Sequence, residues 1–273
     1  MSNEKSLQSE KYLSQVDIHS QWQSDYLNPE LDRFYDLAFA DIVKVLNARP
    51  QDKILDAGCG YCYHTTRLAR SGATITAVDF SDAALAAAQH TIARAGVADR
   101  VNLQQADLTK LPFPDNSFDF VVSWGVLMHI PELEAALAEL SRVLKPAGVL
   151  VLCENNVNSL DVTIRERAVN VIKKLIGRTV PEMRKTKSGT EAWIKEEGGG
   201  LMVRKTRISF LAEFLKTRGL IEFERTAGQF TELYTNLPSK TLKRLVYALN
   251  MLYYTRVRLP SPAMGNIIYY RKI

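Results

Sequence analysis

The sequence predicts an α/β fold in which a mostly parallel sheet carries helices on both faces. From Lys53 onward, short apolar runs alternate with helical patterns at residues 61–71, 82–95 and 131–144, which is typical of parallel strands joined by helices. The composition is also that of an ordinary globular protein, with 46% hydrophobic and 24% charged residues among 273. The apolar runs read KILDAG, TITAVDF, VNLQQAD, FDFVVSWG and GVLVLCEN.

Residues typical of helix ends support these elements. Ser81 can cap the helix of residues 82–95. Pro131 suits the first turn of the next helix, which Pro146 and Gly148 then end. The pattern of apolar residues and the residues at the expected helix ends therefore predict the same elements.

The segments before and after this alternating region show different sequence patterns. Residues 1–50 indicate polar helices that carry the aromatic residues Trp22, Tyr26, Phe34, Tyr35 and Phe39. After Asn155, Ser159 can cap a basic amphipathic helix that stops at Gly177. A looser, lysine-rich tract follows and ends in a predicted hinge, Gly198 to Gly200. Alternation then resumes with a helix at 209–218, a strand from Ile221, a basic amphipathic helix from Lys240 to about Arg256, and the closing strand NIIYYRK.

The composition excludes several classes of protein. Disordered, collagenous and integral-membrane chains are not expected, because the apolar runs are too short to span a bilayer. The polar start lacks the apolar centre of a signal peptide, and three cysteines suit a reducing compartment, so we expect a cytoplasmic protein. Cys59 and Cys62 form a C-x-x-C pair inside a glycine turn without further ligands, so no metal or redox site is expected.

Charge is distributed unevenly along the chain. Residues 1–150 hold 13 Lys and Arg against 19 Asp and Glu, whereas residues 151–273 hold 22 against 11. The basic second half favours an anionic partner, which can be a phosphorylated or carboxylated small molecule or an acidic membrane surface, although a merely solvated basic face explains it equally well. No nucleic-acid-binding signature is present, so nucleic acid is not expected.

The strongest candidate for a functional site is the stretch ILDAGCGYCY. A strand ends at Asp56, and Gly58 and Gly60 then allow a tight turn in which a ligand can lie against bare main chain. Nineteen residues past Gly60, Asp79 ends the second strand, where its carboxylate can accept both hydroxyls of an adenosine ribose. Sites for NAD and for S-adenosylmethionine both use this arrangement.

Two features favour the methyl donor over the dinucleotide. The dinucleotide fingerprint requires a third glycine, and this chain has Tyr63 there. A carboxylate at Asp56 would repel a pyrophosphate but suits a cationic sulfonium and amino group. A third strand ends in Asp107 and Leu108, which offer a hydrogen-bond acceptor and an apolar contact to an adenine ring.

These stretches together resemble the class I S-adenosylmethionine-dependent methyltransferases. The matching segments are ILDAGCGY, AVDFS, QADLTKLPFPDNSFDFVVS and GVLMHIPELEAALAELSRVLKPAGVLVL, over roughly residues 50–155, and the last two strands match more weakly. The resemblance implies a Rossmann-like, doubly wound, seven-stranded sheet in the order 3-2-1-4-5-7-6. The chain departs from the family in having Cys62 where a glycine is common, and Pro146-Ala147-Gly148 where Pro-Gly-Gly is common.

The resemblance also implies a role for each matching residue. Asp56, Gly58, Cys59 and Gly60 would line the methionyl part of S-adenosyl-L-methionine. Asp79 would hold the ribose, Phe80 would lie against the adenine, and Asp107 with Leu108 would contact its edge. Ser123 and Trp124 would face the methyl end of the donor.

Methyl transfer is an in-line displacement, so the protein mainly aligns the acceptor and excludes water. An alcohol or phenol acceptor needs a general base, for which His129 is the first candidate, although a packing role for that residue is the simpler interpretation. His64 is expected to be structural. His19, Trp22 and Tyr26 could form a lid over the acceptor.

We therefore expect an N-terminal helical cap (1–50), a donor-binding core (51–155), a basic helical insertion that serves as acceptor lid (156–205), and the rest of the core with an additional helix (206–273). The insertion would attract an anionic small molecule, methylated on oxygen, through Arg165, Arg167, Lys173, Lys174, Arg178, Arg184, Lys185 and Lys187. Alternatively, these residues and the Lys240 helix dock on a membrane to reach a lipid or isoprenoid acceptor. A non-catalytic protein that binds the donor or its product, and a nicotinamide-dependent oxidoreductase, are further alternatives. The sequence leaves the oligomeric state open.

Overall fold

One seven-stranded sheet organises the computed structural model, which describes residues 28–175, 177, 182–196 and 199–273. Its strands are β1 (Lys53–Ala57), β2 (Thr74–Asp79), β3 (Val101–Gln105), β4 (Phe118–Trp124), β5 (Leu144–Asn155), β9 (Leu220–Ala227) and β10 (Gly265–Lys272). They lie in the order β3-β2-β1-β4-β5-β10-β9, which confirms the order predicted from the family resemblance. Strands β1 to β5 are parallel, whereas β10 runs antiparallel to both β5 and β9.

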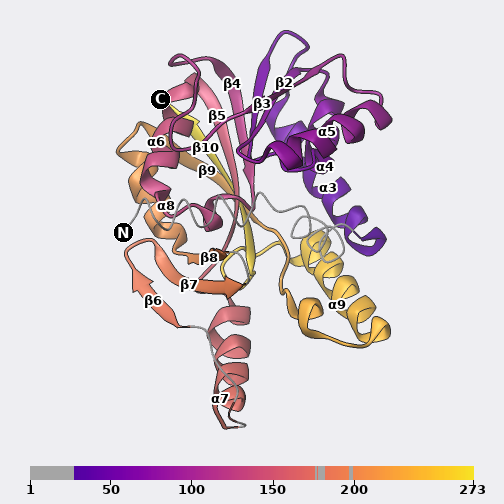
Figure 1. Cartoon of the computed structure of the whole chain (residues 1–273), viewed down its shortest axis with the longest axis vertical. Coiled ribbons are helices and arrows are strands. Elements are labelled where there is room, and N and C mark those ends of the chain that lie inside the picture. Colours follow the sequence, from indigo (N-terminus) through magenta and orange to yellow (C-terminus); the bar gives the residue numbers. More distant parts are fainter. Residues whose placement is uncertain (1–27, 176, 178–181, 197–198) are drawn as a thin grey trace.

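Helices cover both faces of this sheet (Figure 1). One face carries α3 (Pro29–Leu46), α4 (Tyr63–Leu68), α5 (Asp82–Arg94) and α9 (Lys240–Leu252). The other carries α6 (Leu133–Val143) and α8 (Ile208–Lys216). Successive strand residues point to opposite faces, so Ile54 belongs to the first core and Leu55 to the second. The strands are thus apolar on both sides, as a doubly covered parallel sheet requires.

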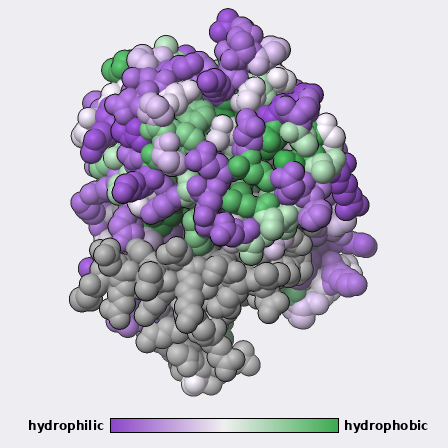
Figure 2. Space-filling model, turned by 45° about the horizontal axis from the view of Figure 1, so that its top comes forward, coloured by the Kyte–Doolittle hydropathy of each residue, from purple (hydrophilic) through white to green (hydrophobic). Residues whose placement is uncertain are grey.

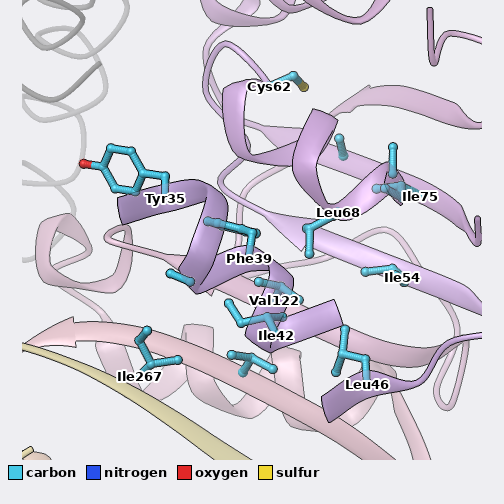
Figure 3. Packing of buried hydrophobic residues seen from close by; sticks show 14 of the residues in the cluster. Tyr35, Phe39, Ile42, Leu46, Ile54, Cys62, Leu68, Ile75, Val122 and Ile267 are labelled. Carbon is cyan, nitrogen blue, oxygen red and sulfur yellow. The ribbon is translucent and has the colours of Figure 1, made fainter. Parts of the chain in front are cut away.

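Helix α3 packs directly on the sheet and begins where the described chain begins. The side-chain oxygen of Asn28 accepts a hydrogen bond from the backbone N–H of Leu31 at 3.0 Å and caps the helix. Phe39 and Ile42 lie on the side of α3 that faces Ile54 of β1 (Figure 3). His19, Trp22 and Tyr26, the residues predicted as a lid, lie outside the described residues.

The insertion after β5 is only partly helical, which corrects the prediction of a helical segment over residues 156–205. A helix forms at its start, as the π-helical turn Asp161–Glu166 followed by α7 (Arg167–Leu175). The remainder pairs as an antiparallel sheet of β6 (Met183–Thr186), β7 (Gly189–Glu196) and β8 (Gly199–Thr206). The two-residue connection Lys187–Ser188 between β6 and β7 lacks the Asn-Gly or Asp-Gly pair that marks such hairpins in a sequence.

The predicted glycine hinge is also wrong, as far as it falls within the described residues. Gly199 and Gly200 begin strand β8 and pair with Glu196 and Lys195 of β7. A Cβ atom on Gly200 would approach Nε1 of Trp193 to 2.4 Å. Glycine is therefore needed there because the indole of the neighbouring strand lies against the main chain, and not because the chain bends.

The surface in view in Figure 2 is mainly hydrophilic, with an apolar area near its middle. Elsewhere on the molecule some charged side chains pair, for example Arg142 with Asp115 and Glu139. Such exposed pairs contribute little each, so the two apolar cores carry the stability. In the part of the chain that the structure describes, no helix has both the length and the apolar character needed to cross a bilayer.

A buried arginine joins the small sheet to the loop that follows β4. Arg204 of β8 is only 1% exposed. Its Nη1 donates to the carbonyls of Leu127 and Ile130 at 3.0 Å each, and its Nη2 donates to the carbonyl of Pro131 at 3.2 Å. Its Nε donates to Glu191 of β7 at 3.1 Å. The loop at the carboxyl end of β4 is therefore held in place by the insertion.

We expect Arg204→Met to lower the free energy of unfolding by about 3 to 5 kcal/mol, because it leaves Glu191 without its buried partner and removes three hydrogen bonds to backbone carbonyls. Urea unfolding followed by circular dichroism measures this loss. Arg184→Met is the matched control, since Arg184 lies in the same small sheet but is exposed. An equal effect of the two substitutions would show that Arg204 does not hold the loop after β4 to the small sheet.

Candidate functional site

The turn between β1 and α4 requires backbone conformations that few residues adopt. Gly58, Gly60 and Cys62 all have positive φ angles, of 84°, 50° and 61°. A Cβ atom on Gly58 would lie 2.5 Å from the side chain of Val126, so only glycine fits there. The N–H of Gly58 donates to the carbonyl of Val78 at 2.8 Å, which holds the turn against the end of β2. A Cβ on Gly60 would meet nothing within 4 Å, so the space beside its main chain is open.

Two carboxylates flank this turn, as predicted from the sequence. Asp56 is buried and accepts a hydrogen bond from Oγ1 of Thr65 at 2.6 Å. Burial raises the pKa of Asp56 to about 6, against the opposing effect of that hydrogen bond. Asp79 accepts from the backbone N–H of Gly60 at 2.9 Å through one oxygen and from that of Ser81 at 3.0 Å through the other. Asp79 therefore ties the turn to the end of β2.

The end of β3 lies beside these residues. Gln105 donates through Nε2 to the carbonyl of Phe80 at 2.9 Å, which links the ends of β2 and β3. Asp107 is exposed, and its two oxygens accept from the N–H and the hydroxyl of Thr109 at 2.8 Å each. Leu108 is buried. The structure thus brings the predicted ribose and adenine contacts to one edge of the sheet.

The two residues predicted at the methyl end of the donor have different surroundings. Ser123 is fully buried, and its hydroxyl donates to the carbonyl of Ala57 at 3.1 Å, so it links β4 to β1. Trp124 packs among aromatic rings, with Phe39 at 4.8 Å and His64 at 5.6 Å between ring centroids. His64 stacks on Phe39, and burial lowers its pKa to about 3, which fits the structural role expected of it.

His129 is a poor general base in this environment. Its Nδ1 lies 3.0 Å from the carbonyl oxygen of Met202, an atom that can only accept, so Nδ1 carries the proton of that hydrogen bond. Burial lowers the pKa of His129 to about 4, although the hydrogen bond to Met202 opposes that shift. A base with so low a pKa accepts a proton weakly at neutral pH. The geometry favours a role in anchoring the loop after β4 to β8.

The C-x-x-C pair consists of two free thiols. The hydrogen bond between Cys59 and Cys62, together with burial, raises the pKa of the Cys59 thiol well above its usual range. A thiol with a raised pKa is a weak nucleophile and a weak metal ligand. Among the described residues, no three His, Cys, Asp or Glu side chains are arranged to hold a metal ion.

Sequence reasoning missed a buried carboxyl group at the end of β5. Glu154 is 1% exposed, and its Oε1 accepts from the N–H of Leu127 at 3.2 Å. Its Oε2 is buried without a hydrogen-bond partner in the described part of the chain. Burial raises the pKa of Glu154 to about 8, with the charge of Arg204 opposing that shift. The only signal in the sequence is one acidic residue near a strand end, which does not distinguish a buried acid from an exposed one.

Comparisons with known proteins bear on this arrangement. The profile of a family described as "Methyltransferase domain" matches residues 55–152. A demethylmenaquinone methyltransferase of Clavibacter sepedonicus is 31% identical over 182 residues, which cover 64% of this chain and 72% of that protein. The sterol 24-C-methyltransferase ERG6B of Gibberella zeae is 34% identical over 110 residues, which cover 40% of this chain and 29% of that protein.

The chain spans only part of the length of most of these relatives. Its matches cover 44% to 64% of six further demethylmenaquinone methyltransferases. Among solved structures, a geranyl diphosphate methyltransferase in complex with SAM superposes with a TM-score of 0.59 and 15% identity, covering 89% of this chain and 87% of that one. A likeness at this level of identity bears on the fold alone.

We expect Glu154→Gln to change how stability depends on pH. In the folded state Glu154 keeps its proton up to a pKa of about 8, whereas its ordinary value is 4.5, so between these values unfolding releases a proton. The contribution of the protonated Glu154 to the free energy of unfolding is therefore complete below pH 4.5. It falls by about 1.4 kcal/mol per pH unit as the pH rises from 4.5 to about 8. Glutamine cannot titrate, so the difference between the two unfolding free energies must change between pH 5 and 8.

Urea unfolding at pH 5, 6, 7 and 8 measures that difference. Glu139→Gln is the control, because Arg142 lowers the pKa of Glu139 and this group stays ionised over the whole range. A difference between wild type and Glu154→Gln that stays constant with pH would disprove the buried acid.

Proposed function

Because the chain belongs to the class I S-adenosylmethionine-dependent methyltransferases, we propose that it transfers a methyl group from this donor to a lipid-like acceptor. The observation that carries the donor half of the proposal is the open space beside the main chain of Gly60, in the turn between the carboxylates Asp56 and Asp79. Bare main chain beside two acidic side chains suits a ligand that bears a sulfonium and an amino group.

In this proposal each strand end contacts one part of the donor. The turn from Asp56 to Gly60, with Gly58 and Cys59, lines the methionyl group, and Asp79 accepts hydrogen bonds from the ribose hydroxyls. Phe80, Asp107 and Leu108 contact the adenine, since these residues lie at the neighbouring strand ends. Asp79 then exchanges its hydrogen bond with the N–H of Gly60 for the ribose, or shares it.

The donor brings a methyl carbon that is already activated by the positive sulfur. The protein must align an acceptor atom with the carbon–sulfur bond and exclude water, and these are tasks of packing rather than of covalent catalysis. Trp124 and the loop after β4, held by Arg204 and His129, are placed to form that wall. His129 therefore acts as a positioning residue in this proposal, and no general base is assigned.

An apolar acceptor is better supported than the anionic metabolite expected from the sequence. Among the predicted basic residues, Arg165 pairs with Asp161 at 2.5 Å and Lys187 with Glu134 at 2.5 Å, so these charges are already neutralised. Arg184 is exposed on β6. The relatives reported above are named for methyl transfer to demethylmenaquinone and to sterols, both of which are membrane lipids.

Donor binding tests the first half of the proposal. We expect Asp79→Ala to weaken binding of S-adenosylhomocysteine by about 10- to 100-fold, the effect of losing hydrogen bonds to a charged group. Isothermal titration calorimetry measures it, with Asp99→Ala as control, because Asp99 is exposed and pairs with Arg100. Undiminished binding by Asp79→Ala, or binding of NADH in place of the nucleoside, would refute this donor site.

Transfer of a labelled methyl group tests the acceptor. The full chain is incubated with labelled donor and either a detergent-dispersed demethylmenaquinone and sterol mixture or a panel of water-soluble carboxylated and phosphorylated metabolites. We expect label in the organic phase with the lipids and none above background in the metabolites. Label in the aqueous products would support the anionic acceptor instead, and binding without transfer to either panel would support a non-catalytic role.

A further inference from the structure

Two helical segments carry most of the exposed apolar side chains. Of the sixteen large hydrophobic side chains that are exposed in the described residues, eleven lie in residues 160–175 and 242–259. These segments contain α7 and α9, which both project at the lower end of the molecule in Figure 1. Leu175 is 80% exposed, Ile164 63% and Leu245 62%. Clusters of this kind on a surface indicate a binding site more often than chance.

On each segment four of the exposed apolar residues form one stripe. In α9 the stripe recurs at intervals of three, four and three residues, which places it on one side of a helix. The buried side of α9 is a different one and contains Val246 and Asn250. The stripe is therefore not the face that packs on the core. The stripe residues are Leu242, Leu245, Leu249 and Leu252 on α9, and Leu160, Ile164, Val171 and Leu175 on the first segment.

A buried polar clasp couples the two segments. The hydroxyl of Thr231 donates to the carboxylate of Asp161, at the start of the first segment. The N–H of Thr231 donates to Oδ1 of Asn250 in α9 at 3.0 Å, and Nδ2 of Asn250 donates back to the carbonyl of Thr231 at 2.9 Å. All three side chains are buried. The clasp fixes the orientation of the two stripes relative to each other.

Both segments connect to the sheet on the side where the parallel strands end, which is also the side of the candidate site. The first segment follows directly on β5, and α9 leads back through residues 253–264 into β10. The last residue of β5, Asn155, pairs with Gly265, the first residue of β10. Cys153 of β5 pairs with Trp124 at the end of β4. The stripes thus begin close to the strand ends at which a ligand binds in open α/β sheets.

The charge of the segments identifies what covers the stripes. Residues 240–258 contain five Lys and Arg and no Asp or Glu, and residues 160–175 contain four against two. A symmetric contact with a second copy would place these cations opposite one another. A bilayer that contains anionic lipids instead offers an apolar interior to the stripes and negative head groups to the cations.

We propose that the two stripes, one on residues 160–175 and one on α9, form one docking surface for an anionic lipid bilayer. This proposal rests on the proposed function in one respect: a lipid acceptor would enter the site from this surface. Docking itself requires neither donor nor acceptor, so it can fail while the proposed function holds.

Vesicle flotation of the full chain tests the surface. We expect wild type to float with phosphatidylcholine vesicles that contain about one third phosphatidylglycerol, and to remain unbound with pure phosphatidylcholine or at high salt. The double variant Leu245→Glu, Leu249→Glu should bind about tenfold less. Ile221→Glu, Phe223→Glu is the matched control, because these exposed apolar residues of β9 lie outside the stripes.

Thermal unfolding with and without S-adenosylhomocysteine shows whether each variant retains its fold and donor site. If the α9 variant does not fold, the single variant Leu175→Glu, at the exposed end of α7, is tested in its place. It should also bind the anionic vesicles more weakly than wild type. Equal losses in the β9 control, equal binding to neutral vesicles, or a dimer in solution that dissociates in the α9 variant would each overturn the proposal. A loss confined to the stripe variants, with donor binding intact, supports it.

Discussion

The left-handed turn after β1 is the constraint on which the rest of the site depends. Gly58 must lack a Cβ because Val126 occupies that space, and its N–H is bound by the carbonyl of Val78. Asp79 then holds the N–H of Gly60. Three elements that are distant in the sequence, β1, β2 and the loop after β4, therefore meet at one turn of a few residues. Any side chain added at Gly58 would move all three, so the geometry of the proposed donor site and the packing of the strand ends cannot vary independently.

The two carboxylates that flank this turn favour a positively charged ligand. Asp56 is buried beside Asp79, and both burial and the neighbouring charge raise its pKa to about 6. Near neutral pH its ionised form is therefore only moderately favoured. A positive charge placed in the open space beside Gly60 would stabilise the ionised carboxylate and would be stabilised by it in return. A diphosphate would have the opposite effect on both groups, so a carboxylate at the end of β1 favours a cationic ligand over a dinucleotide in the proposed donor site.

The sequence sufficed for those parts of the fold that local patterns specify. Alternating strands and helices, a cap such as Ser81 and glycines in a tight turn are written into neighbouring residues, and the sheet order followed from the family resemblance. The small sheet was missed because its hairpin at Lys187–Ser188 has no turn signal. The burial of Glu154 and Arg204 was missed for another reason. Both depend on contacts between β5, β8 and the loop after β4, and no local spacing encodes contacts across 27 residues, as for Glu154, or 77 residues, as for Arg204.

The proposed donor and acceptor sides of the molecule are built by different physical means. The donor side rests on main-chain geometry and two apolar cores, whereas the insertion and α9 are held in addition by buried polar groups, namely Arg204 and the clasp of Asp161, Thr231 and Asn250. Burying such groups costs desolvation that well-packed apolar residues would avoid, so their value lies in fixing one geometry rather than in added stability. A polar clasp has few alternative arrangements, while an apolar contact between two leucine-rich helices has many. The clasp therefore keeps the apolar stripes of α7 and α9 apart from the core and in a defined relation to the strand ends.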